Sequence, residues 1–90
     1  MPQYNWIMAT VTLTREAAAG LEELPLVIHA RVLALLERSS NWPAVSGAKR
    51  LTGPLAGHYR LRTGDYRLQF RAEGQTVIVE KVGHRSRLYK

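Results

Sequence analysis

Polar and apolar residues alternate strictly along the stretch His58 to Phe70, whose sequence is H-Y-R-L-R-T-G-D-Y-R-L-Q-F. Strict alternation is typical of a strand with one buried face. The Gly64-Asp65 pair in the middle predicts a two-residue hairpin turn, because glycine tolerates the positive φ that the turn needs. The register that follows pairs Thr63 with Tyr66, Arg62 with Arg67, Leu61 with Leu68, Arg60 with Gln69, and Tyr59 with Phe70.

This predicted hairpin has one apolar face and one basic face. The apolar face consists of Tyr59, Leu61, Leu68 and Phe70. The basic face consists of Arg60, Arg62, Arg67, Gln69 and Arg71. Like charges directly opposite one another destabilise a sheet, so the Arg62–Arg67 pair has a cost that an anionic ligand would relieve. A solvated polar face is the alternative interpretation.

The pattern before the hairpin predicts one strand and two helices. After a loose lead-in over residues 1–5, the β-branched and apolar run Trp6 to Leu13 predicts a strand. Thr14 is a suitable N-cap for a helix from Arg15 to Leu24. Apolar residues at helical spacing predict a second helix from Leu26 to Arg38, and a glycine-rich connector follows over residues 46–57.

After the hairpin, Glu73-Gly74 predicts another tight turn, and Thr76 to Val82 predicts a third strand. Its expected register places Val77 near Phe70, Val79 near Leu68 and Glu80 opposite Arg67. The element order predicts one α+β domain over residues 1–90, in which residues 1–6 are a loose N-terminal extension. We expect an N-terminal strand, a two-helix hairpin and a three-stranded antiparallel meander, with both helices on one face of a small antiparallel sheet.

Composition narrows the class of protein. The 90 residues include no cysteine and three scattered histidines, so we expect neither a disulfide framework nor a metal site, and no cofactor. The N-terminus has no basic region followed by a long apolar run, and no stretch approaches the ~18 apolar residues of a membrane span. We therefore expect a cytoplasmic protein without a membrane partner.

The net charge of +6 is concentrated in the second half of the chain. Residues 1–45 carry three arginines and four glutamates, whereas residues 46–90 carry ten Lys or Arg residues and three acidic ones. This asymmetry indicates a polyanionic partner for the second half, either nucleic acid or an acidic protein.

Four arginines on one open sheet face would make a phosphate-binding surface, because the guanidinium group is a fork of donors that stays charged at any working pH. Near the C-terminus, Gly83 is followed by His84, Arg85 and Tyr89. Histidine is suited to proton transfer near neutral pH. Such residues would support RNA cleavage by the ribose 2′-hydroxyl, which needs a base, an acid and cations around the phosphate but no metal.

Five stretches resemble the RelE/ParE superfamily of bacterial toxin–antitoxin toxins. They are V-T-L-T-R-E-A near the start, L-E-E-L-P from Leu21, K-R-L-T-G from Lys49, Y-R-L-R-T-G-D-Y-R-L from Tyr59 and V-G-H-R-S-R-L-Y from Val82. Together they span about Ile7 to Tyr89, and the last two are specific in combination. The superfamily fold is a small antiparallel sheet with two N-terminal helices, as the pattern predicts.

The resemblance implies site residues. The RelE branch cuts mRNA in the ribosomal A site, and its active-site positions match Arg60, Arg62, Arg67, Arg85 and Tyr89. The namesake enzyme has lysines at the first two positions. A lysine can lose its proton when its pKa falls, whereas an arginine practically cannot, so the general base does not carry over. We expect His84, Arg85, Tyr89 and Arg67 to be catalytic, with His84 or Tyr89 transferring protons. We expect RNA phosphates to bind at Arg60, Arg62, Arg71, Lys49 and Arg50.

The sequence thus predicts a toxin that is a metal-independent, ribosome-dependent mRNA endoribonuclease. Its implied partners are a cognate antitoxin and mRNA on the ribosome. Two alternatives remain open at this point: a gyrase inhibitor of the ParE branch, and a non-catalytic basic domain that binds RNA or protein.

Overall fold

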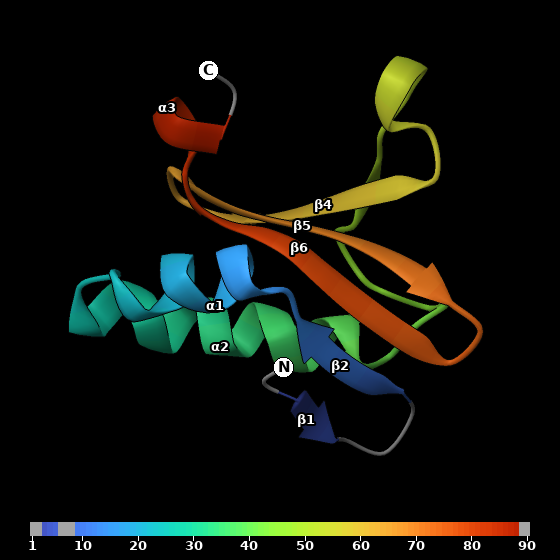
Figure 1. Ribbon diagram of the computed structural model, residues 1–90, viewed down its shortest axis with the longest axis horizontal. Helices are drawn as coiled ribbons and strands as arrows, with labels where there is room; N and C mark the ends of the chain where they lie inside the picture. Colours follow the sequence, from blue (N-terminus) through green and yellow to red (C-terminus); the bar gives the residue numbers. More distant parts are fainter. Residues whose placement is uncertain (1–2, 6–8, 89–90) are drawn as a thin grey trace.

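The computed structural model describes residues 3–5 and 9–88 (Figure 1). Its elements are β1 (Gln3–Asn5), β2 (Thr10–Leu13), α1 (Arg15–Glu22), α2 (Leu26–Ser39), β3 (Lys49–Arg50), the 3-10 turn η1 (Gly53–Leu55), β4 (His58–Thr63), β5 (Tyr66–Glu73), β6 (Thr76–His84) and α3 (Arg85–Leu88). Both predicted helices are confirmed within two residues at each end. The first four residues of the predicted first strand, 6–9, are not in β2: residues 6–8 lie outside the described part, and Ala9 precedes the strand.

In the described residues the strands form one sheet in the order β1-β2-β6-β5-β4-β3. β2 runs parallel to β6, and every other neighbouring pair is antiparallel. Helices α1 and α2 cover one face, whereas α3 and η1 rise on the opposite side (Figure 1). The α+β class, the three-stranded meander β4-β5-β6 and the placement of both long helices on one face are therefore confirmed.

The β4–β5 hairpin has the register that the sequence predicts, with all five expected pairs. Gly64 supplies the turn with a φ of 59°. Leu61, Leu68 and Phe70 are buried in the core, and Tyr59 packs against them. Trp42 contacts this cluster edge-on, with its ring centroid 5.0 Å from that of Tyr59. The apolar face of the hairpin thus forms the floor on which the helices pack.

The expected β5–β6 register is wrong for two reasons. The turn consists of Gly74-Gln75 and not of the predicted Glu73-Gly74, because Glu73 pairs with Thr76, and a β-bulge then interrupts the ladder. Phe70 pairs with Val79, as against the expected Val77, and Gln69 pairs with Lys81, so Glu80 is an extra residue in β6. The bulge returns Val82 to the core, where it is 5% exposed. A bulge of this kind keeps apolar residues on the buried face of a strand where they are three residues apart and not two.

Both edges of the sheet differ from the expected loops. Gln3–Asn5, predicted as a loose lead-in, pairs antiparallel with residues 10–12. Lys49–Arg50, predicted as part of a connector, pairs with Tyr59 and Arg60. Both edge strands are only two or three residues long, too short for an alternating pattern to mark them in the sequence.

Thr14 joins α1 to the bulge. Its side-chain oxygen accepts the backbone N–H of Ala17 at 3.1 Å, as expected of an N-cap, and its hydroxyl donates to the carbonyl of Glu80 at 3.0 Å. Further along α1, a Cβ at Gly20 would lie 2.1 Å from the carbonyl oxygen of Val82. Glycine at this position therefore allows α1 to lie directly on β6.

Candidate nucleic-acid interface

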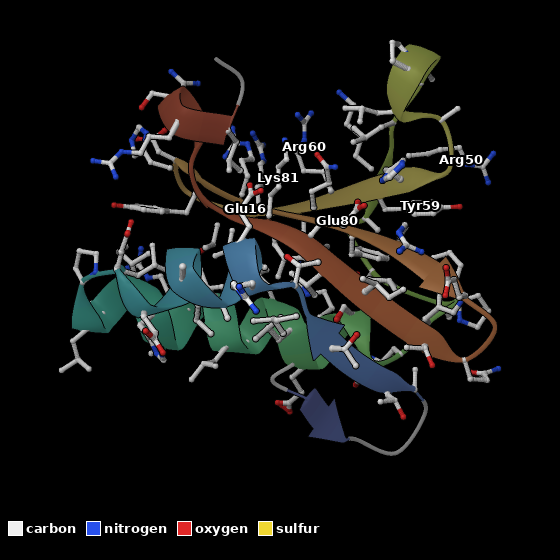
Figure 2. The ribbon with its side chains drawn as sticks, in the orientation of Figure 1. Glu16, Arg50, Tyr59, Arg60, Glu80 and Lys81 are labelled. Atoms are coloured by element: carbon white, nitrogen blue, oxygen red, sulfur yellow. The ribbon has the colours of Figure 1, made fainter. Side chains whose placement is uncertain are left out.

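The face of the sheet turned away from α1 and α2 carries a row of long polar side chains. Strand pairing aligns Lys49 with Arg60, Arg60 with Gln69, and Gln69 with Lys81. Side chains of directly paired residues lie on the same face, so this row crosses four strands. Figure 2 shows Arg60 and Lys81 on this side of the sheet. Gln69 is 5% exposed and forms the floor of the row.

A cleft of about 320 Å³ lies at the β3–β4 side of this face. It is lined by Gly47, Lys49, Arg60, Arg62 and Arg67, and we call it the cationic cleft. Among the described residues no carboxylate lines it. Four cations around one small space repel one another, and a phosphate group would relieve that repulsion.

Arg67 is the most enclosed of these cations, with 8% of its surface exposed. Its Nη1 donates to the carbonyl of Gly64 at 2.8 Å and to that of Tyr66 at 3.3 Å. The hairpin turn therefore fixes the direction of the guanidinium in the cleft. The structure brings Arg67 together with Arg60, Arg62 and Lys49, four of the nine residues that the sequence predicts for the site.

The same hairpin turn also holds Arg85. The backbone N–H of Arg85 donates to the carbonyl of Asp65 at 2.8 Å, and its Nε lies 3.9 Å from the Asp65 carboxylate. Asp65 is therefore a turn residue that anchors α3. Because Gly64 anchors Arg67 and Asp65 anchors Arg85, two predicted catalytic arginines are attached to adjacent residues of one turn.

Arg71 and Arg50 do not line the cationic cleft. Arg71 lies 2.5 Å from a carboxylate oxygen of Glu73 and 3.4 Å from one of Glu80. The hydrogen bond that Arg71 donates to Glu73 raises the pKa of Arg71 above its ordinary value, so the paired group is a permanent cation. Arg50 follows Lys49 in β3, and successive strand residues point to opposite faces.

Glu80 is the centre of a compact polar cluster next to Arg71. One of its carboxylate oxygens lies 2.5 Å from His58 Nδ1 and accepts from Gln69 Nε2 at 3.3 Å. His58 is thus a hydrogen-bond partner of Glu80. The expectation that Glu80 would lie opposite Arg67 is wrong, because the shifted turn and the bulge together place Gly83 there.

His84 lies on the other face of the sheet. It pairs with Tyr66, which belongs to the same face as Leu68, and the two rings meet edge-on with centroids 5.2 Å apart. There it lines a separate cleft of about 450 Å³ between α3 and the α1–α2 turn. None of the arginines of the cationic cleft lines this second cleft.

The hydrogen bonds of His84 define its tautomer. The backbone N–H of Ser86 donates to His84 Nδ1 at 3.1 Å, and the Ser86 hydroxyl lies 2.9 Å from the same nitrogen. A backbone N–H can only donate, so Nδ1 of the neutral ring is an acceptor and the proton is on Nε2. His84 therefore holds the first turn of α3. Tyr89 is outside the described residues.

Sequence reasoning missed Lys81. The spacing of three valines indicates its direction: Val77 and Val79 are two residues apart, as in a regular strand, but Val82 follows Val79 by three residues. One extra residue between Val79 and Val82 restores the alternation and turns Lys81 toward the basic face.

The part of the chain that the structure describes contains no helix with the length and apolar character needed to cross a membrane. Nor does it contain three or more His, Cys, Asp or Glu side chains grouped so that they could hold a metal ion.

Comparisons with known proteins identify the family. Residues 11–89 match the family described as the ParE toxin of the type II toxin–antitoxin system, parDE. The chain is 32% identical to Toxin RelG of Mycobacterium tuberculosis, covering 90% of this chain and 95% of that protein. It is 29% identical to Toxin RelE3 of Methanocaldococcus jannaschii, covering 88% and 93%.

The structure of the toxin–antitoxin complex RelBE2 from M. tuberculosis is similar, with a TM-score of 0.74 and 31% identity over 87% of this chain and 99% of that one. With the family match, the sequence relatives and the shared fold in agreement, the chain belongs to the toxin family of type II toxin–antitoxin systems that this match describes, within the RelE/ParE superfamily that its motifs resemble.

Proposed function

We propose that this toxin is an endoribonuclease that cuts mRNA on the ribosome, with the cationic cleft as its phosphate-binding site. The observation that carries the proposal is the lining of that cleft, which has four cations and, in the described residues, no carboxylate. Relatives named RelE3 and RelG support the RelE branch. The cytoplasm, where mRNA is translated, is then its place of action.

The chemistry proposed is attack of a ribose 2′-oxygen on the adjacent phosphorus. The new O–P bond forms as the bond to the 5′-oxygen breaks, which leaves a 2′,3′-cyclic phosphate and a 5′-hydroxyl. Negative charge builds on the non-bridging oxygens, and preoriented cations stabilise it. Arg67 is suited to this role because the turn carbonyls fix its direction. Arg85, anchored to the next residue of the turn, is the second candidate.

Two residues are proposed for proton transfer, Tyr89 and His84. The proton must leave the 2′-hydroxyl, and another must reach the 5′-oxygen. His84 uses Nδ1 to accept from Ser86, so its neutral ring offers a proton on Nε2 and no vacant acceptor. It also lies across the sheet from the cationic cleft. These two observations favour Tyr89 as the base and give His84 the task of holding α3.

Substitution at His84 separates these tasks. Asparagine retains an acceptor oxygen that can replace Nδ1 in the bond from Ser86, but it does not titrate. If His84 is a positioning residue, His84→Asn retains most cleavage and His84→Ala loses it. Equal loss in both variants, with the rate of the wild type depending on a group that titrates near neutral pH, would assign the proton transfer to His84.

We also infer that a cognate antitoxin binds this chain. Support comes from the RelBE2 neighbour, which is a toxin–antitoxin complex. The net charge of +6 favours an acidic segment in the antitoxin, which would cover the basic face or the helical side. A pull-down from native cells should recover a small acidic protein with the toxin. Recovery of the toxin alone would contradict this inference.

Inducible expression in a bacterial host tests the function. Growth and the 5′ ends of mRNA are followed together for the wild type, Arg67→Gln, Arg85→Ala, Tyr89→Phe and the control Arg31→Gln on the exposed side of α2. We expect growth arrest with new mRNA ends inside reading frames, retained in the control and lost in the other three variants. Arrest with intact mRNA and inhibited gyrase would overturn the proposal in favour of the ParE branch. Absence of arrest would overturn both toxic activities.

A further inference from the structure

The row of side chains that crosses the sheet extends beyond the cationic cleft. Lys49 and Arg60 line the cleft, and Lys81 is two strands farther along the same row, with buried Gln69 between them. Strands are about 4.8 Å apart, so the backbone positions of Arg60 and Lys81 are separated by roughly 10 Å. Among the described residues no ion pair involves Lys81.

Lys81 occupies this position because of the bulge at Glu80. Without the extra residue, alternation from Val79 would direct Lys81 to the buried face. The bulge is held from several sides: the Thr14 hydroxyl donates to the Glu80 carbonyl, and the Glu80 carboxylate contacts His58 and Arg71. The direction of Lys81 is therefore a fixed feature of the fold.

The two ends of the basic face differ in charge. Toward the β5–β6 turn, the carboxylates of Glu73 and Glu80 already pair with Arg71 and His58 and would repel a phosphate. The cluster borders the row at Gln69, whose Nε2 donates to Glu80, and the row from Lys49 to Lys81 crosses the strands at nearly right angles on the side of the β4–β5 turn. A phosphate chain that follows the cations must therefore run across the strands, over a span of roughly 14 Å between the outer two.

We propose that the phosphate surface continues onto β6, where Lys81 binds a further phosphate, so that single-stranded RNA crosses the sheet from β3 to β6. This inference rests on the proposed function, because it extends the same site. The substrate is then an RNA strand with at least one phosphate on each side of the phosphate that binds at Arg60. Lys81 acts in binding, outside the reacting centre, and so affects affinity more than the rate of the bound complex.

The salt dependence of binding tests Lys81. The probe is a fluorescent 12-nucleotide RNA with 2′-O-methyl groups, which cannot attack the phosphate. Each phosphate contact contributes about 0.7 to the slope of log K against log salt for a single strand. We expect Lys81→Gln to reduce that slope by about 0.7 and to weaken binding severalfold at low salt. Lys81→Arg should retain both values, and the helical-face control Arg31→Gln should equal the wild type.

Neutral methylphosphonate groups, placed one at a time in the same RNA, test the path. One methylphosphonate position should abolish the effect of Lys81→Gln, a second that of Lys49→Gln, and a third that of Arg60→Gln. Along the RNA, the Lys81 and Lys49 positions should lie on opposite sides of the Arg60 position. Identical positions for Lys49 and Lys81 would overturn the crossing path. If Arg62→Gln reduces the slope and Lys81→Gln does not, the role of Lys81 is wrong and the proposed function is unaffected. If neither variant changes the slope, the proposed function fails with it.

Discussion

The polar face of the sheet has two halves that contain the same kinds of residue in different charge balance. In the cationic half, Lys49, Arg60, Arg62 and Arg67 surround a cleft without a carboxylate in the described chain. In the paired half, Arg71 and His58 contact the carboxylates of Glu73 and Glu80. The two halves share β4 and β5, with the cationic half extending onto β3 and the paired half onto β6, and the sequence predicts one continuous basic surface across them.

The difference shows that pairing across strands determines which arginines are available to a ligand. Arg67 and Arg71 are four residues apart in β5 and share a face. Within the described residues Arg67 donates only to uncharged turn carbonyls, so its full charge is directed at the cleft. Arg71 has two anionic neighbours that offset its charge. A bound phosphate is therefore stabilised more by Arg67 than by Arg71.

The largest effect is expected for Arg67→Gln. Removal of one preoriented group that stabilises transition-state charge typically lowers kcat by about 100-fold or more. We expect a loss of that size in ribosome-dependent mRNA cleavage, and little loss for Arg71→Gln, its matched arginine in the paired half. Circular dichroism would confirm that both variants fold at the assay temperature. Equal rates in the two variants would remove the distinction between the halves.

Gly20→Ala should lower stability without touching either half. The added methyl group would collide with the carbonyl of Val82, and overpacking of this kind costs about 1–3 kcal/mol. This cost should exceed the ~1 kcal/mol that alanine gains in helix propensity. Urea unfolding measures the loss in the free energy of unfolding. This variant also shows how much cleavage is lost through reduced stability alone, which is the reference for the variants of the cationic half. A more stable variant would contradict the close approach of α1 to β6.

The paired half should become a binding surface when its carboxylates are neutralised. In the double variant Glu73→Gln, Glu80→Gln, the charge of Arg71 is no longer offset, so we expect severalfold tighter binding of the 2′-O-methyl RNA. The salt slope should steepen by about 0.7, the contribution of one further phosphate contact. Glu37→Gln on the exposed side of α2 removes an anion far from this face and serves as the control. Equal affinity in the double variant and the wild type would mean that phosphates never reach this half.

Much of the fold was predictable from local pattern. The Gly64-Asp65 turn set the β4–β5 register, since a two-residue loop allows one pairing, and helical spacing of apolar residues marked both long helices. The parallel pairing of β2 with β6 joins segments more than 60 residues apart, and no local signal specifies it. The short edge strands β1 and β3 are defined only by the neighbour that they pair with.

The site was predictable in part for the same reason. Arg60, Arg62 and Arg67 share the cleft because the hairpin register that places them was correct. The direction of Lys81 depends on the register of β6, which the local pattern does not specify. The pairing of Arg71 depends on that register only through Glu80, because its nearer partner Glu73 lies two residues along the same strand. A single extra residue at Glu80 changes which side chains meet there, and it is visible in the sequence only as the displaced Val82.

The central claim is that phosphates bind the cationic half and not the paired half. The most direct measurement is the salt slope of RNA binding for Arg62→Gln and Arg71→Gln, a matched pair that removes one arginine from each half. The account predicts that Arg62→Gln reduces the slope by about 0.7, one phosphate contact, and that Arg71→Gln leaves it unchanged. An equal reduction in both variants, or a reduction in Arg71→Gln alone, would contradict it.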